Sequence, residues 1–328
     1  MKELVNNDVN VPSLRLPEQK RVLNGHIRKV QGLSWADDSC HIIASDQGGK
    51  TIIWDAYRRM KTKVITKPFT VAVAMHPSRP IAAIGGMDNA VTIWSTENEG
   101  ADCTLMRQLE RHDGYISSLK FVGEDQMLSA AGDAEVALWD LNAWKVKTAF
   151  YGHEGDASCI RFPAGVPGSH LFCTSSSDGT VRVWDLRNGD CTHKFDVQGE
   201  CNASAFFPNG TAVAAGSHDG STYLFDLRSQ TALQRYPRKN NHVSAVEFSR
   251  SGRTMFVAYE DGHVCLWDPL TNSEGGYAHK LAAHVKNPSN DPRQRVISCM
   301  SLSPDGTCLA TGAFDSTIRL WGPATGGA

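Results

Sequence analysis

Long apolar runs are missing from this chain of 328 residues: no stretch approaches the ~20 consecutive apolar residues that a membrane-spanning helix needs. The opening residues, Met1 to Asp8, also lack the apolar core of a secretory signal peptide. The sequence therefore predicts a protein with no integral membrane segment and no secretory leader.

An excess of charge of either sign is missing as well. Lys and Arg total 33 and Asp and Glu total 35, which gives a formal net charge of −2. A broad basic surface for nucleic acid is therefore not expected. Apolar residues make up 41% of the chain and charged residues 21%, so the chain can bury a sizeable core. The 29 glycines and 14 prolines favour many turns and short elements.

Signs of catalysis or metal binding are few. The nine cysteines are odd in number and form no C-x-x-C pair, which is typical of a reduced cytoplasmic protein with buried thiols and no metal cluster. Ser217, His218 and Asp219 resemble a triad in miniature, but neighbours in one turn cannot adopt the relay geometry of nucleophilic catalysis. We predict a protein that is not an enzyme and that has neither a cofactor nor a metal.

What the sequence does contain is an internal repeat. Aromatic anchors recur at intervals of 40 to 54 residues, at Trp54, Trp94, Trp139, Trp184, Phe225, Trp267 and Trp321. An aspartate stands six residues before every anchor but the first, at Asp88, Asp133, Asp178, Asp219, Asp261 and Asp315. Histidines lie further upstream in four units, at His26, His112, His153 and His284. Periods of this length indicate a repeat architecture.

Each unit has the pattern of short β-strands. The residues from Val181 to Trp184 alternate apolar and polar side chains, which is typical of a half-buried strand. Asp178-Gly179 is a hairpin-turn dipeptide directly before that strand. The pattern predicts about four strands in each unit, joined by tight turns.

These residues resemble the WD40 repeat, whose unit is one four-stranded blade of a β-propeller. The resemblance implies an all-β fold, a seven-bladed WD40 β-propeller, over residues 21–322. Residues 21–24 would form the outer strand of the last blade and close the ring. Residues 1–20 are expected to be a short irregular segment, and residues 323–328 a C-terminal tail.

The resemblance also implies a structural role for the repeated residues. In WD40 proteins the Asp, the upstream His and the anchor form a hydrogen-bonded network that is buried inside the blade. The first unit has Gly48 where the Asp belongs, so its network should be incomplete, and the second and fifth units lack a clear Gly-His pair. A buried Asp without partners costs roughly several kcal/mol, which is why such a network is needed.

Four stretches are similar to the β subunit of heterotrimeric G proteins in particular. They are residues 51–57, residues 205–210 with 224–228, residues 248–253 with 258–261, and residues 85–89. Phe225 replaces the anchor Trp, as in that family's fifth blade. The resemblance implies a signalling protein, one face of which binds the GDP-bound α subunit and, after release, effectors.

Carrying over the family's contact positions one by one gives the expected protein-binding face: Lys29, Phe69, Met87, Tyr115, Asp156, Asn202, His218 and Phe314. Aromatic and apolar side chains ringed by polar groups are the usual composition of a binding hot spot. The family usually has Trp at the positions of Phe69 and Phe314, and Asp at that of His218. These differences fit a different α partner or weaker binding.

The family's N-terminal helix, which forms a coiled coil with the γ subunit, has no counterpart here. Pro12 and Pro17 interrupt any continuous helix, and no heptad pattern is visible, so the residues do not support a γ partner. The alternative is a β-like WD40 scaffold that works without γ and without nucleotide-dependent binding of an α subunit. Either role implies a cytoplasmic location, or one at the inner face of the plasma membrane that is reached through partners.

Two further features each allow two interpretations. The basic run of Arg58, Arg59, Lys61 and Lys63 fits a solvated loop, or a docking site for an acidic partner or a lipid headgroup. Trp144 stands at a hairpin turn, where it either packs on a neighbouring blade or forms a second contact point.

Overall fold

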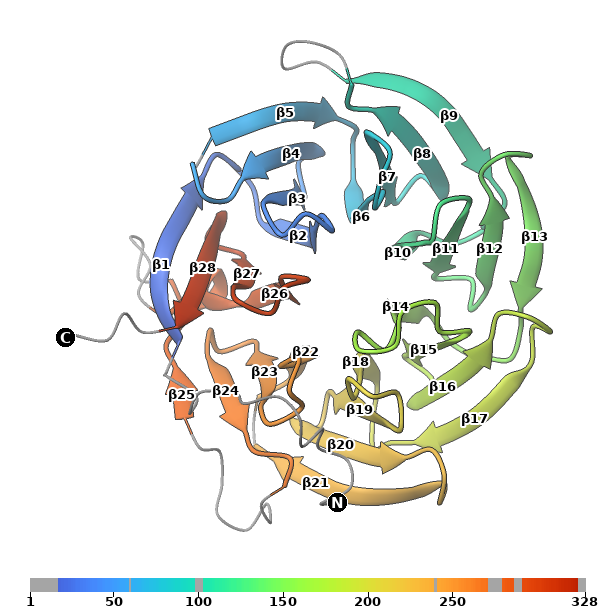
Figure 1. Ribbon diagram of the computed structural model, residues 1–328. Coiled ribbons are helices and arrows are strands. Elements are labelled where there is room, and N and C mark those ends of the chain that lie inside the picture. The colour runs from blue at the N-terminus through green and yellow to red at the C-terminus, as the bar shows by residue number, and fades with distance from the viewer. Residues whose placement is uncertain are drawn as a thin grey trace.

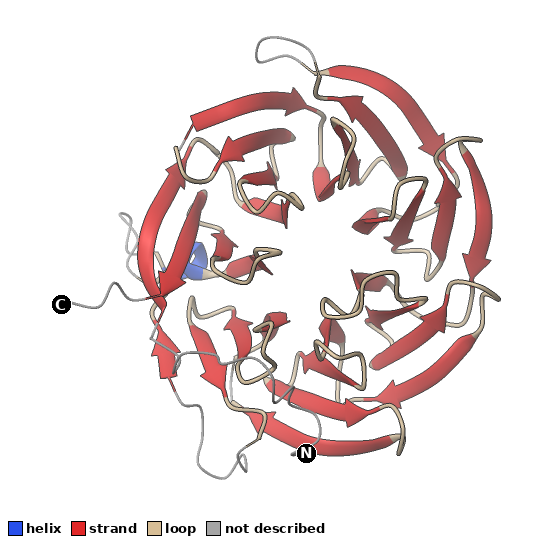
Figure 2. Cartoon of the chain, viewed as in Figure 1, coloured by secondary structure: helices blue, strands red, loops and turns tan. Residues whose placement is uncertain are grey.

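Seven antiparallel sheets of four strands each surround a central channel (Figure 1). The computed structural model describes residues 17–58, 60–97, 103–238, 241–270, 279–285 and 291–323. Within these residues the chain is almost entirely strand and turn, with one short 3-10 helix, η3 (Pro292–Arg295), as Figure 2 shows. The expected all-β, seven-bladed β-propeller is confirmed.

The first six blades each use four consecutive strands, ordered from the channel outwards. Blade 1 contains β2 (Val30–Trp35), β3 (His41–Asp46), β4 (Lys50–Asp55) and β5 (Met60–Thr66). Blade 2 contains β6 (Thr70–Met75), β7 (Ile81–Gly86), β8 (Ala90–Ser95) and β9 (Thr104–Glu110). Blade 3 contains β10 (Ile116–Val122), β11 (Gln126–Ala131), β12 (Val136–Asp140) and β13 (Lys145–Phe150).

The next three blades follow the same order. Blade 4 contains β14 (Ala157–Arg161), β15 (Leu171–Ser176), β16 (Thr180–Asp185) and β17 (Cys191–Asp196). Blade 5 contains β18 (Cys201–Phe206), β19 (Ala212–Ser217), β20 (Ser221–Asp226) and β21 (Thr231–Pro237). Blade 6 contains β22 (Val243–Phe248), β23 (Met255–Tyr259), β24 (Val264–Trp267) and β25 (His279–Leu281).

The seventh blade joins the two ends of the chain. It contains β26 (Ile297–Leu302), β27 (Leu309–Ala313), β28 (Thr317–Pro323) and, outermost, β1 (Pro17–Asn24), which pairs antiparallel with β28. Residues 17–20 therefore lie in a strand, not in an irregular segment, and residue 323 ends β28 instead of starting a tail. Pro17 is tolerated because it begins an edge strand, where its missing N–H breaks no ladder. Residues 1–16 and 324–328 lie outside the described residues.

Apolar side chains packed between neighbouring blades form the core. The rings of Phe150 in blade 3 and Phe172 in blade 4 meet edge to face with their centroids 5.0 Å apart. Leu23 of β1 lies in the same buried cluster as Val30 and Trp54 of blade 1. The seam where the chain ends meet is therefore packed in the same way as the other blade contacts.

The innermost strands share one register. Each pairs with its neighbour through a shift near its start, between Val30 and Gly32 in blade 1 and at the equivalent place in the other six blades. Such a shift is a β-bulge, which bends the strand locally. Because the bulge recurs at the same place, residues at the same position in each innermost strand lie at the same level of the channel.

The cysteines differ from the expectation of buried thiols. All nine are thiols outside any disulfide, but Cys40 and Cys191 are exposed and only four are fully buried, namely Cys159, Cys173, Cys201 and Cys265. Within the described residues, no helix has the length and apolar character needed to cross a membrane.

Candidate functional site

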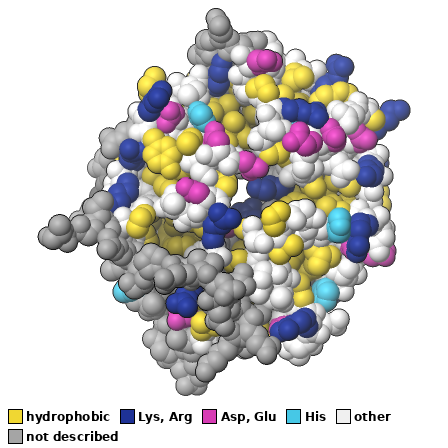
Figure 3. Space-filling model, in the orientation of Figure 1, with side chains coloured by type: hydrophobic (Ala, Val, Ile, Leu, Met, Phe, Trp, Pro, Cys, Tyr) yellow, Lys and Arg dark blue, Asp and Glu magenta, His cyan; other side chains and the backbone are white. Residues whose placement is uncertain are grey.

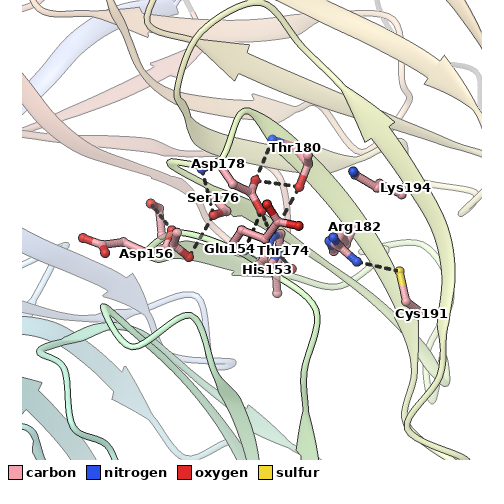
Figure 4. A network of polar contacts seen from close by, with 12 residues as sticks. His153, Glu154, Asp156, Thr174, Ser176, Asp178, Thr180, Arg182, Cys191 and Lys194 are labelled. Atoms are coloured by element: carbon pink, nitrogen blue, oxygen red, sulfur yellow. Dashed lines mark hydrogen bonds and ion pairs between the residues drawn. The ribbon is translucent and has the colours of Figure 1, made fainter.

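The network of blade 4 shows how a repeat unit holds its own loops in place (Figure 4). Nδ1 of His153 lies 3.0 Å from Oδ2 of Asp178 and donates to it. Nε2 of His153 accepts from the Thr174 hydroxyl at 2.7 Å, and the indole N–H of Trp184 donates to that same oxygen at 2.8 Å. The Thr174 hydroxyl thus links Trp184 to His153 by hydrogen bonds, and His153 in turn donates to Asp178. We call this chain of bonds the relay, and the hydroxyl the relay hydroxyl.

The electrostatics of this blade favour one protonation state. Burial lowers the pKa of His153, so the imidazole is neutral and its Nε2 can accept. Burial alone would raise the pKa of Asp178, but the Thr180 hydroxyl and the backbone N–H of Glu154 donate to its carboxylate. These bonds, with that of His153, lower the pKa of Asp178 to about 2. The carboxylate is therefore charged at neutral pH and fixes the loop N–H groups around it.

Blades 3 and 7 repeat the relay with Ser129 and Thr311 as the hydroxyl groups. In both, the hydroxyl oxygen lies 2.7–3.0 Å from the histidine Nε2 and 2.8–3.0 Å from the indole nitrogen. The histidines in turn lie 3.0 and 2.9 Å from their aspartates. In all three blades the hydroxyl stands ten residues before the anchor, a spacing that is visible in the sequence and that sequence reasoning missed.

Blade 1 departs from the sequence prediction in the identity of its carboxylate. Gly48 occupies the expected Asp position, but Asp46, at the end of β3, accepts from Nδ1 of His26 at 3.2 Å. Ala44 stands where the relay blades have a hydroxyl. Nε2 of His26 and Nε1 of Trp54 are consequently buried with no hydrogen-bond partner among the described residues. The network is incomplete because the hydroxyl is missing, not because the carboxylate is.

Blade 2 replaces the histidine with a lysine. Nζ of the buried Lys67 lies 3.1 Å from Asp88 and donates to the carbonyl of Ala90 at 2.9 Å. Burial lowers the pKa of Lys67, although the hydrogen bond to Asp88 opposes that shift. The anchor Trp94 donates to Thr92 at 3.0 Å, so it does not use a relay hydroxyl on the second strand.

Blades 5 and 6 hold their aspartates with other cations. Asp219 accepts from the Tyr223 hydroxyl at 3.0 Å and from Arg235 at 2.9 Å. Asp261 accepts two hydrogen bonds from the guanidinium of Arg238. Every repeat aspartate therefore has a partner, although those of blades 2, 5 and 6 use no upstream histidine, as the missing Gly-His pairs of blades 2 and 5 predicted.

Two sets of loops meet at the same end of every blade. The residue before each repeat Asp position donates its backbone N–H to the carbonyl of the residue before the innermost strand. The donor and acceptor pairs are Gln47 with Lys29, Met87 with Phe69, Gly132 with Tyr115, Ser177 with Asp156, His218 with Glu200, Glu260 with His242, and Phe314 with Val296. We call these paired residues the loop ring; it contains seven of the eight expected contact residues.

The eighth expected contact residue, Asn202, lies apart from these pairs. It is the exposed second residue of β18 and lines the central channel next to the loop ring. The structure thus brings all eight candidates to one end of the propeller.

Phe69 and Met87 are the most exposed apolar members of the loop ring. Their side chains are 64% and 58% exposed, and the N–H of Met87 donates to the carbonyl of Phe69 at 3.0 Å. Phe69 has a φ of 57°, a left-handed conformation that is rare for a bulky residue. A strained, exposed aromatic contributes little to folding, which makes Phe69 a candidate contact residue.

Two contacts between neighbouring blades fix other members of the loop ring. The ammonium of Lys29 lies 4.2 Å from the ring centroid of Phe314, which is a cation–π contact between blades 1 and 7. The hydroxyl of Tyr115 donates to Asp156 at 3.0 Å, between blades 3 and 4. Burial and the neighbouring Asp156 carboxylate raise the pKa of Tyr115 to about 12, so it remains a donor.

A histidine pair occupies the loop ring between blades 5 and 6. The ring centroids of His218 and His242 are 3.5 Å apart, and Nδ1 of His242 contacts the carbonyl of His218. Glu200 lies 3.9 Å from Nδ1 of His218. The described residues nevertheless contain no cluster of three or more side chains suited to holding a metal ion.

The structure also shows the surroundings of Trp144 and of the basic run at residues 58–63. Trp144 packs partly buried against the apolar cluster of blades 2 and 3, with the guanidinium of Arg107 5.9 Å from its ring centroid, which favours the packing interpretation. In the basic run, Arg58 is exposed beside Asp55 at 3.7 Å, and Lys61 lies 5.4 Å from the ring of Trp54. Arg59 lies outside the described residues.

A closed ring of WD40 blades with exposed apolar side chains among paired loops is typical of a propeller that acts by binding other proteins. The family described as G protein beta WD-40 repeat protein matches residues 1–322, and the chain belongs to this family.

Curated relatives agree with this assignment. The chain is similar to "Guanine nucleotide-binding protein subunit beta-1" of Nicotiana tabacum, at 31% identity over 320 residues that cover 92% of this chain and 82% of the relative. It is 32% identical to "Guanine nucleotide-binding protein subunit beta" of Solanum tuberosum and of Oryza sativa subsp. japonica, with the same coverage.

Proposed function

We propose that this protein acts as a G-protein β-subunit-like signalling protein that binds a GDP-bound α subunit through the loop ring and Asn202. The observation that carries the proposal is the pair Phe69 and Met87, two apolar side chains left exposed next to one another. Apolar anchors surrounded by polar groups account for most of the binding energy in protein interfaces. The printed names of the relatives, which are G protein β subunits, favour a partner of this class.

The polar members of the loop ring would reduce the cost of binding. Lys29 is held over Phe314, and Asp156 is held by Tyr115, before any partner arrives. Side chains that are already ordered lose less rotamer entropy on association than mobile ones. We therefore expect Phe69 and Met87 to provide apolar contact area and these two pairs to set the orientation of the α subunit.

Release would follow from the state of the partner, not from chemistry on this chain. In this proposal the GDP-bound α subunit covers the loop ring with its switch region, and GTP remodels that region so that the α subunit leaves. Effectors then bind to the same exposed side chains. The two kinds of partner exclude each other because they share Phe69, Met87 and their neighbours.

The face is tested by truncating its aromatic members. Phe69→Ala and Phe314→Ala should each weaken binding of the GDP-loaded α subunit by about 1–3 kcal/mol without unfolding the protein. Leu105→Ala is the matched control, because Leu105 is 50% exposed but lies on the outer strand β9, away from the loop ring. Affinities are measured by surface plasmon resonance, and unchanged affinity in both aromatic variants would remove this face assignment.

The nucleotide dependence separates this role from the β-like scaffold. A pull-down with GDP-loaded and GTP-analogue-loaded α subunit should retain only the GDP-loaded form. Equal retention of both forms would favour a scaffold that ignores the nucleotide.

We also propose that the propeller folds without a γ subunit, since β1 closes the ring by pairing with β28 within the one chain. Expression of the chain alone should yield a soluble monomer by size-exclusion chromatography with light scattering. A strict requirement for a co-expressed γ subunit would contradict this part of the proposal.

A further inference from the structure

The innermost strands bring seven residues to one level, and five of them, Ser34, Lys120, Arg161, Glu247 and Ser301, line the central channel. All seven share the fifth position of the innermost strands, where the common register places them opposite one another: Ser34, Ala74, Lys120, Arg161, Ala205, Glu247 and Ser301. Three of the seven are charged and the other four are small. The small side chains leave space in the channel beside the three charged ones.

The charges in this ring are unbalanced. The guanidinium of Arg161 lies 3.4 Å from the Glu247 carboxylate and donates to the carbonyl of Ile160 at 3.2 Å. Its Nε is buried and has no hydrogen-bond partner among the described residues. Lys120 is equivalent to Arg161 on the neighbouring blade, and among the described residues its ammonium is influenced by nearby charges and not by a hydrogen bond. Within the seven positions one positive charge is thus left over after Arg161 and Glu247 pair, although the carboxylate of Asp37 also lines the channel.

Burial makes the excess charge costly. Desolvation lowers the pKa of Lys120, and the positive charge of Arg161 lowers it further. The carboxylates of Glu247 and Asp37 act in the opposite direction. Arg250, which is exposed, lines the same channel and adds a further positive charge. The channel is therefore lined by three cations, Lys120, Arg161 and Arg250, and by two carboxylates, Asp37 and Glu247, and a mobile anion would offset the one positive charge in excess.

The channel has the size and the lining of a small-molecule site. Its volume is about 550 Å³, and Lys120 also lines a second hollow of about 300 Å³. Serine hydroxyls line the larger space, among them Ser244, whose buried oxygen has no partner among the described residues. Pockets for small ligands are typically about 300–1,000 Å³ with a few convergent polar groups. Figure 3 shows Lys or Arg side chains inside the central hollow of the face in view.

We propose that the central channel binds a small oxyanion, a phosphate- or carboxylate-bearing metabolite, between the Lys120 ammonium and the Arg161 guanidinium. The oxyanion accepts hydrogen bonds from both cations, and the surrounding serine hydroxyls contact the rest of the molecule. This site is separate from the loop ring, and the proposal does not depend on a partner α subunit.

Inorganic phosphate and citrate are the probes, because they distinguish the two sources of an oxyanion. Each is titrated into the full chain by isothermal calorimetry, with sodium chloride at matched ionic strength as the blank. Lys120→Gln should weaken the binding of the preferred probe about tenfold or more, as expected for the loss of one charge-assisted hydrogen bond. Lys145→Gln, which removes an exposed lysine on the outer strand β13, should leave the affinity within about twofold.

A second measurement locates the anion without any variant. Crystals of the native protein soaked in selenate should show an anomalous peak within hydrogen-bond distance of Lys120 and Arg161. The proposal is overturned if neither probe binds above the chloride blank, if Lys120→Gln binds as well as the native chain, or if selenate occupies only other sites.

Discussion

The missing hydroxyl of blade 1 can be restored by a single substitution. Ala44 is fully buried at the position that carries the relay hydroxyl in blades 3, 4 and 7. Ala44→Ser would place an oxygen between Nε1 of Trp54 and Nε2 of His26. The indole could then donate to the new hydroxyl, which could in turn donate to the imidazole.

The structure shows that there is space for the serine hydroxyl and allows the gain in stability to be estimated. The ring centroids of His26 and Trp54 are 6.4 Å apart, compared with 5.9 Å for His153 and Trp184, between which a hydroxyl already fits. Each new hydrogen bond contributes about 1 kcal/mol, and two buried groups cease to be unsatisfied. Burying the serine offsets part of this gain, which leaves about 1–3 kcal/mol. In a chain of this size that corresponds to roughly 1.5–4.5 °C in Tm.

Urea denaturation and calorimetry measure the effect, with Ala44→Val as the control. Valine adds bulk at the same place but brings no hydroxyl, so it should give no gain or a loss. The reasoning is refuted if Ala44→Ser is no more stable than the native chain, or if Ala44→Val stabilises the protein as much as serine does.

Two further predictions concern blade 4. Thr174→Val removes the relay hydroxyl and leaves His153 and Trp184 unsatisfied, so the free energy of unfolding should fall by about 2–4 kcal/mol in urea melts; a change below about 0.5 kcal/mol would contradict the relay. Acid should destabilise the protein in two windows. His153 has a pKa lowered from 6.5, so the unfolded chain binds its proton first and stability falls as the pH drops below that value. Asp178, lowered from 3.8 to about 2, adds a loss between those pH values that Asp178→Asn should abolish.

The propeller was predictable because each blade repeats the same local signals. The spacing of the anchors and the turn dipeptides such as Asp178-Gly179 identify the blades without any long-range information. The ends of strands β1 and β28 were harder to predict from the sequence. Pro17 and Pro323 look like breakers in the sequence, but Pro17 begins the edge strand β1, and Pro323 ends β28 beyond its pairing with β27, so the strands extend to include them.

The network partners were only partly predictable. The role of Asp46 depends on a side chain that reaches the histidine from the strand end, two residues before the usual position, and spacing rules do not capture such a replacement. Lys67 and Arg238 likewise satisfy their aspartates from places where the sequence shows only generic basic residues. Any buried carboxylate needs partners, but several donors can meet that need equally well.

The three charged residues that the fold brings together in the channel could not be predicted from the sequence. Lys120, Arg161 and Glu247 lie far apart in the chain, and only the shared bulge of the innermost strands brings them to one level. A single charged residue in an apolar–polar alternation is normally assigned to the solvent face of a strand. In a propeller the innermost strand has a third environment, the channel, which the alternation does not reveal.

Blades 1 and 5 both lack the relay hydroxyl, but their anchors differ in whether they need one. Where the anchor is Phe225, the residue ten places earlier is Ala215, so there is neither an N–H to satisfy nor a hydroxyl to satisfy it. Trp54 combines an indole N–H with Ala44, and this mismatch lies next to the seam closed by β1. Because Ala44 is fully buried, restoring the hydroxyl should strengthen the blade without touching the loop ring. Ala44→Ser should therefore raise stability while partner affinity stays unchanged, which would show that the mismatch affects folding alone.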